Sequence, residues 1–122
     1  MKRVTLMRGQ NPSKGVFHVK KVLIFCAGGL SSSLIAKEAA KLFQTESKDI
    51  AVDAISVTLG QKMIEAGEYD LYLVSPQVRM YYDRLAKIAG RMDRKIDQIP
   101  AQAYVPLPKQ TRMLTDLIET YI

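Results

Sequence analysis

The sequence predicts a single α/β domain built on a parallel β-sheet, and three observations support this fold class. The chain has 122 residues, 48% of them hydrophobic, which suits one domain with a sizeable core. Short apolar runs alternate with segments of helical periodicity, as in strands joined by crossover helices. The first run, residues 22–26, is apolar without interruption, as expected for a strand buried on both faces of a parallel sheet.

The first half of the domain contains two predicted strand–helix units. After the strand over residues 22–26, apolar residues recur at helical spacing and predict a helix over residues 31–46. A second strand is predicted over residues 50–57. A short helix follows over residues 58–66, and Gly67 ends it because glycine readily adopts the left-handed conformation of a helix C-cap.

The second half repeats this order. A third strand is predicted over residues 71–74, and Ser75 and Pro76 end it. Apolar spacing from residue 78 to residue 89 predicts a helix with Gly90 at its C-terminal end. A fourth strand over 95–99 and a loop over 100–108 follow. Pro108 suits the first turn of a final helix with an apolar stripe over residues 113–121.

The order of these units predicts the topology of the sheet. Right-handed crossovers between parallel strands place helices on both faces. With the first strand central and the second and third on either side of it, the strand order is 2-1-3-4. The loop after Cys26 then lies at the topological switch point, where open α/β sheets bind ligands.

Composition excludes several classes of protein. A single cysteine excludes an internal disulfide framework and a multi-cysteine zinc site, and a single histidine excludes sites that need two histidines. The apolar runs are too short for a transmembrane helix. We expect no metal and no cofactor.

The net charge of +6 is unevenly distributed. Residues 1–21 contain six basic residues and no acidic one, whereas the remaining twelve basic residues equal the twelve acidic ones. The body is therefore neutral, which argues against a nucleic-acid-binding domain. We predict that residues 1–19 form a flexible basic extension and that His18 is an ordinary surface residue. A basic arm touching an acidic partner or lipid headgroups, and a transit peptide, are the alternatives.

The segment from Cys26 to Ser33 joins the first strand to the first helix and has the composition of an anion site. Gly28 and Gly29 let backbone N–H groups converge, and the helix N-terminus adds a positive dipole. Three consecutive serines, residues 31–33, can cap the helix or donate hydroxyl hydrogen bonds to an anion. Such surroundings favour the nucleophilic thiolate of Cys26. A small buried cysteine, a tight turn and helix-capping serines are the structural alternative.

The spacing separates this loop from other phosphate sites. A tyrosine-phosphatase loop places an arginine six positions after its cysteine, where this chain has Ser32. A nucleotide-binding loop would need Gly-Lys-Ser/Thr, which is absent. A receiver domain would need an acceptor aspartate at the end of the third strand, where Ser75 stands. A site that accepts a phosphoryl group without hydrolysing it fits better.

Two segments carry a resemblance to a known family. The segment 22–33, with Cys-x-x-Gly-x-Ser-Ser-Ser after a buried strand, resembles the phosphorylation loop of lactose/cellobiose-type enzyme IIB proteins of the bacterial sugar phosphotransferase system. Residues 69–77, Tyr-Asp-Leu-Tyr-Leu-Val-Ser-Pro-Gln, resemble the third strand and Pro-Gln turn of that family. The resemblance covers residues 20–122, and the basic extension lies outside it.

The resemblance implies a cytoplasmic phosphocysteine domain over residues 20–122. Cys26 would accept a phosphoryl group from the phosphohistidine of a IIA protein and pass it to a sugar held by a IIC membrane permease. The implied partners are these two proteins, met in transient contacts by a monomer, with membrane contact only through the permease. The implied phosphate-binding residues are Ala27, Gly28, Gly29, Leu30, Ser31, Ser32 and Ser33, with Pro76, Gln77 and Arg79 as the adjacent wall.

The sequence departs from the family pattern at three places, and two alternative functions are also compatible with it. Ala27 replaces a small polar residue, Arg79 adds a positive charge, and Pro106-Leu107-Pro108 replaces a more usual acidic, glycine-containing segment. The alternative functions are a low-molecular-weight-type cysteine phosphatase and a non-catalytic regulatory domain that docks on a transcription factor or permease.

Overall fold

The fold was analysed in a computed structural model that describes residues 19–28 and 30–122. Four parallel strands form one sheet: β1 (Lys20–Cys26), β2 (Ile50–Ser56), β3 (Leu71–Val74) and β4 (Ile96–Gln98). Their order is β2-β1-β3-β4, which confirms the predicted topology. The extension predicted over residues 1–19, including His18, lies outside the described residues apart from Val19.

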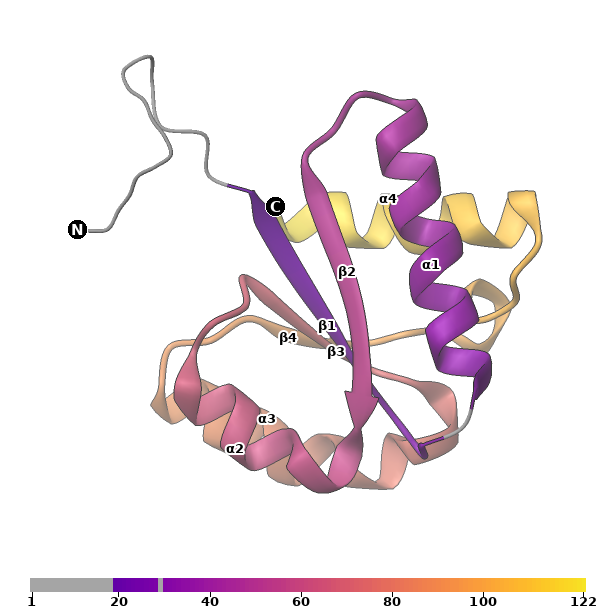
Figure 1. Cartoon of the computed structure of the whole chain (residues 1–122). Helices are drawn as coiled ribbons and strands as arrows, with labels where there is room; N and C mark the ends of the chain where they lie inside the picture. The colour runs from indigo at the N-terminus through magenta and orange to yellow at the C-terminus, as the bar shows by residue number, and fades with distance from the viewer. Residues whose placement is uncertain (1–18, 29) are drawn as a thin grey trace, which may run out of the picture.

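Helices cover both faces of the sheet, as predicted (Figure 1). The helices α1 (Leu30–Thr45) and α4 (Pro108–Tyr121) lie on one face. The helices α2 (Gly60–Ala66) and α3 (Tyr82–Arg91) lie on the other. No helix within residues 19–28 and 30–122 is long and apolar enough to span a bilayer.

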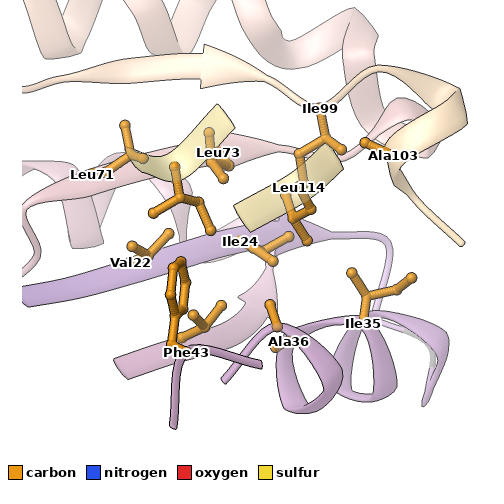
Figure 2. Close-up of a cluster of buried hydrophobic side chains, with 13 residues drawn as sticks. Val22, Ile24, Ile35, Ala36, Phe43, Leu71, Leu73, Ile99, Ala103 and Leu114 are labelled. Carbon is orange, nitrogen blue, oxygen red and sulfur yellow. The ribbon is translucent and has the colours of Figure 1, made fainter. Parts of the chain in front are cut away.

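The side chains of β1 alternate between two buried clusters because successive residues of a strand point to opposite faces. Val22 and Ile24 pack in the cluster beneath α1 and α4 (Figure 2). Leu23 and Phe25 pack in the cluster beneath α2 and α3. All four are at most 1% exposed, which explains why the strand is apolar without interruption after its two N-terminal lysines. By the same alternation, Cys26 faces the α1 and α4 side.

Several element boundaries differ from the predictions, most of all after β3. A 3-10 helix, η2 (Pro76–Tyr81), precedes α3, so the helix predicted to begin at Val78 begins as α-helix only at Tyr82. Val78 has non-helical angles (φ −123°, ψ 26°), which interrupt the helical course before α3, and its side chain is buried in the cluster beneath α2 and α3. Gly90 lies inside the last turn of α3, which ends at Arg91.

The remaining differences are small. A 3-10 helix, η1 (Val57–Leu59), precedes α2, and Gly67 caps α2 with φ +66°, as predicted. The fourth strand is shorter than predicted, although the Ile99 N–H continues its pairing by donating to the Val74 carbonyl at 2.9 Å. The loop predicted over 100–108 contains a 3-10 helix, η3 (Ala101–Ala103), and α4 begins at Pro108 as predicted.

Candidate phosphate-binding loop

Cys26 is the last residue of the central strand β1, at the carboxyl edge of the sheet. Its side chain is 4% exposed, and the Sγ–H donates a hydrogen bond to the Ile55 carbonyl of β2 at 3.3 Å. Strands β2 and β3 flank it, so the thiol lies at the switch point between them. The fold therefore places the only cysteine of the sequence where ligands bind in open α/β sheets.

The turn after Cys26 depends on a glycine. Gly28 has φ +101°, a conformation that residues with a side chain rarely adopt, and apart from its chain neighbours no described residue has an atom within 4 Å of where its Cβ would be. The backbone angle, and not a shortage of space, therefore requires glycine at this position. Ala27 and Gly28 are both exposed, which leaves this part of the backbone accessible from solvent. Gly29 lies outside the described residues.

The turn leads directly into α1, which begins at Leu30 and has no acidic residue in its first turn. Unpaired N–H groups and the helix dipole make this end of the helix positive. Because the first turn has no acidic side chain, an anion bound here meets no side-chain repulsion from that turn. An anion bound between Cys26 and α1 would be stabilised by backbone groups.

The three serines of this turn are in different environments. Ser33 is exposed, and the side chains of Leu30 and Ser31 lie outside what the structure describes. Ser32 is 1% exposed, and its hydroxyl is hydrogen bonded to the Tyr104 hydroxyl. The Ser32 hydroxyl is therefore held in place by a residue that follows η3, far away in the sequence.

The predicted Pro76-Gln77 wall begins at the same edge of the sheet as the loop. The Ser75 N–H donates to the Phe25 carbonyl at 3.0 Å, which joins the end of β3 to β1 one residue before Cys26. Pro76 then starts η2, with Gln77 and Arg79 exposed on it. An exposed arginine adds positive charge to the segment that follows the strand beside β1.

The structure also has a depression at the opposite, amino edge of the sheet, with a volume of about 280 Å³. It contains no cysteine, histidine or serine, and it lies a full strand length from Cys26. We assign the candidate site to the Cys26 loop because a nucleophilic side chain, a glycine turn and the N-terminus of α1 follow one another there. The depression is lined by Lys20, Gly67, Tyr69, Asp70, Asp93, Arg94, Lys95, Tyr121 and Ile122.

Sequence analysis missed two residues of this region. Tyr104 contacts Ser32 from a loop after β4, and no local motif signals that contact. The sequence assigns Ser75 no role in the site, although its side chain is 0% exposed and it follows the residue that pairs with Phe25. Within the described part of the chain, no group of three or more His, Cys, Asp or Glu side chains could hold a metal ion.

The fold and the site define a class of parallel α/β proteins in which the central strand ends in cysteine and a glycine turn leads into a helix. The model of the family described as "PTS system, Lactose/Cellobiose specific IIB subunit" matches residues 21–111. The chain belongs to this lactose/cellobiose IIB family of the sugar phosphotransferase system, as the resemblance in its sequence predicts.

Curated relatives support the same family. The chain is 26% identical over 110 residues to the lactose-specific EIICB component of Staphylococcus haemolyticus strain JCSC1435, covering 90% of the chain and 18% of the relative. It is 28% identical over 98 residues to the lactose-specific EIICB component of Staphylococcus aureus, covering 80% of the chain and 17% of the relative. The chain thus spans less than a fifth of the length of these relatives.

Solved structures show the same fold. The lactose-specific IIB component domain from Streptococcus pneumoniae superposes with a TM-score of 0.74 at 23% identity, covering 85% of this chain and 98% of that one. The cellobiose-specific IIB component from Borrelia burgdorferi superposes with a TM-score of 0.65 at 21% identity, covering 84% and 91%.

Proposed function

We propose that this chain is a phosphoryl carrier in sugar uptake. Cys26 accepts a phosphoryl group from a IIA phosphohistidine and passes it to a sugar bound by a IIC permease. The observation that carries the proposal is the position of Cys26, buried at the end of the central strand and followed by a turn that requires Gly28. Membership of the lactose/cellobiose IIB family supports the same function.

Two transfers make up the proposed reaction. In the first, the P–N bond of phosphohistidine breaks and a P–S bond forms at Cys26, while the thiol proton ends on the released imidazole nitrogen. In the second, the P–S bond breaks and a P–O bond forms to a sugar hydroxyl, whose proton ends on the Cys26 sulfur. Both steps balance without a metal, a nucleotide or a redox cofactor.

The loop would hold the phosphoryl group through backbone donors. Amide groups from Ala27 to Ser33 would surround the phosphoryl oxygens, and the positive end of α1 would offset their charge. The hydroxyls of Ser31, Ser32 and Ser33 are the proposed side-chain donors. Pro76, Gln77 and Arg79 would form the wall beside them, and the exposed Arg79 could contact phosphate or an acidic partner surface.

The environment of Ser32 favours a carrier over a phosphatase. A phosphatase of this type uses an arginine at that position to hold the transition state for hydrolysis, whereas Ser32 is neutral, buried and bonded to Tyr104. The loop therefore holds a phosphoryl group without a guanidinium clamp. Retention of that group until the acceptor arrives is what a carrier requires.

The proposed partners follow from the two transfers. A IIA protein supplies the phosphohistidine, and a IIC permease presents the sugar. The name EIICB of the relatives supports the pairing with IIC. We propose that the chain works as a cytoplasmic monomer that meets each partner transiently, since it must release one before it reaches the other.

Intact-mass spectrometry tests the proposal. Incubation with a phosphorylated IIA protein should add one phosphoryl group to the full chain and none to Cys26→Ser, while both proteins stay folded. An adduct that survives in Cys26→Ser would overturn the assignment of Cys26. Tight IIA binding with no adduct on the unmodified chain would favour the regulatory alternative.

A further inference from the structure

Ser75 is a buried neighbour of Cys26. Phe25 of β1 and Val74 of β3 are partners in the register of the sheet, so Cys26 and Ser75 are the next residues on each strand. Ser75 keeps an extended backbone (φ −69°, ψ 156°), and its N–H donates to the Phe25 carbonyl. Alternation along both strands therefore places the Ser75 side chain on the same face as that of Cys26.

The hydroxyl of Ser75 is 0% exposed and has no hydrogen-bond partner among the residues that the structure describes. Burying a hydroxyl without a partner costs free energy, whereas alanine would fill nearly the same volume at no such cost. A hydroxyl kept in this position is therefore suited to a partner that exists only in another chemical state of the site.

The Cys26 sulfur has two protonation states, the neutral thiol and the negatively charged thiolate. The thiol is satisfied by donating to the Ile55 carbonyl at 3.3 Å, on the β2 side of the strand. A thiolate has no proton to donate, and the carbonyl oxygen would repel its negative charge. Once charged, the sulfur therefore needs a donor in place of the acceptor that it now contacts.

The two residues beside Cys26 in the sheet are both serines, and of these two only Ser75 has a hydroxyl without a hydrogen-bond partner among the described residues. Ser56, its register partner on β2, accepts from the Thr58 N–H and is hydrogen bonded to the Thr58 hydroxyl at 2.9 Å. Ser75, on the β3 side, has no such bond. Adjacent strands are about 4.8 Å apart, so rotation about χ1 can bring the Cys26 sulfur within hydrogen-bond distance of the Ser75 hydroxyl.

We propose that the Ser75 hydroxyl donates a hydrogen bond to the Cys26 sulfur whenever that sulfur carries negative charge. It would then stabilise the thiolate that attacks the phosphoryl donor and the same thiolate as it leaves in the second transfer. The part concerning phosphoryl transfer rests on the proposed function. The stabilisation of the thiolate does not, because it concerns the unmodified chain alone.

The test is the pH dependence of Cys26 alkylation by iodoacetamide, measured by intact mass on the full chain. In Ser75→Ala the midpoint of the rate profile should move up by about one pH unit, a roughly tenfold loss of rate well below the midpoint. Its thermal unfolding midpoint should stay level or rise by a few degrees, because a buried unpartnered hydroxyl is removed. Ser56→Ala, the matched control, should leave the alkylation midpoint unchanged.

Ser75→Thr should change the alkylation midpoint and the unfolding temperature in the opposite pattern to Ser75→Ala. It keeps the hydroxyl and adds a methyl group to a fully buried position, so it should lower the unfolding temperature yet leave the alkylation midpoint near that of the unmodified chain. An unshifted midpoint in folded Ser75→Ala, or an equal shift in Ser56→Ala, would overturn the role of Ser75. Neither result bears on the proposed function, which is tested separately by whether phosphorylated IIA leaves a stable phosphoryl group on Cys26.

Discussion

The Ser32 and Tyr104 hydroxyls are hydrogen bonded to each other although the residues are 72 positions apart. Ser32 lies in the first turn of α1, and Tyr104 follows η3 in the loop between β4 and α4. The bond therefore ties the first turn of α1, which follows the Cys26 turn, to the loop over residues 100–108. Because Ser32 is buried, loss of this partner leaves its hydroxyl unpaired in the protein interior.

Tyr104→Phe should destabilise the protein by about 1–2 kcal/mol, since it removes one partner of a buried hydrogen bond and leaves the ring in place. It should also slow phosphoryl uptake by loosening the start of α1. Urea unfolding measures the first effect, and the rate of adduct formation measures the second. Tyr81→Phe is the control, because the Tyr81 side chain is 38% exposed. Equal stability of the two variants would contradict this role of Tyr104.

Gly28→Ala and Gly90→Ala form a second matched pair. Apart from neighbouring residues of the chain, a Cβ meets no described atom within 4 Å at either position, but of the two only Gly28 has a positive φ, of +101°. Gly28→Ala should therefore cost about 1–2 kcal/mol of stability and reduce the rate of phosphorylation. Gly90→Ala, in the last turn of α3, should instead stabilise the protein by up to about 1 kcal/mol. Urea unfolding of both variants measures the difference, and a stabilising Gly28→Ala would refute the backbone requirement.

The raised pKa values of two tyrosines predict that the protein loses stability at alkaline pH. The hydrogen bond from Tyr121 to Asp97 at 2.5 Å, together with burial, raises the pKa of Tyr121 from 10.0 to about 12. Burial, together with the hydrogen bond from Tyr69 to Asp53 at 2.9 Å, raises the pKa of Tyr69 to about 12 as well. Between these values the unfolded chain loses protons that the folded chain keeps, so stability falls as the pH rises.

The contribution of both tyrosines should be complete below about pH 10 and lost by about pH 12. Urea midpoints measured across this range give the slope. The double variant Tyr69→Phe/Tyr121→Phe should have a flatter profile, because neither phenol is left to titrate. A variant profile as steep as that of the unmodified chain would show that other groups cause the loss.

Much of the fold could be predicted because its signals are local. The uninterrupted apolar run of β1, the spacing of α1 and the proline at the start of α4 each identify their element within a few residues. The start of α3 could not be located this way. Val78 has the apolar spacing of a helix and is buried as that spacing implies, but its backbone is non-helical, and apolar spacing reports burial and not backbone angles.

Only the part of the candidate site that lies in one continuous segment, residues 26–33, could be predicted from the sequence. Cys26, the glycine turn and the serines are contiguous, so their composition alone indicates an anion loop. Tyr104 and Ser75 reach this region through the strand order and register of the sheet, which bring together residues far apart in the chain. Burial also separates Ser32 from Ser33, although the two are adjacent in sequence and equally plausible as donors.

The most direct test of the central claim follows a radioactive phosphoryl group after transfer from a phosphorylated IIA protein. We expect the label to be on Cys26, to stay on the isolated protein in buffer, and to return to unphosphorylated IIA when that protein is added. A label on His18, or its prompt release as inorganic phosphate, would contradict a phosphocysteine carrier.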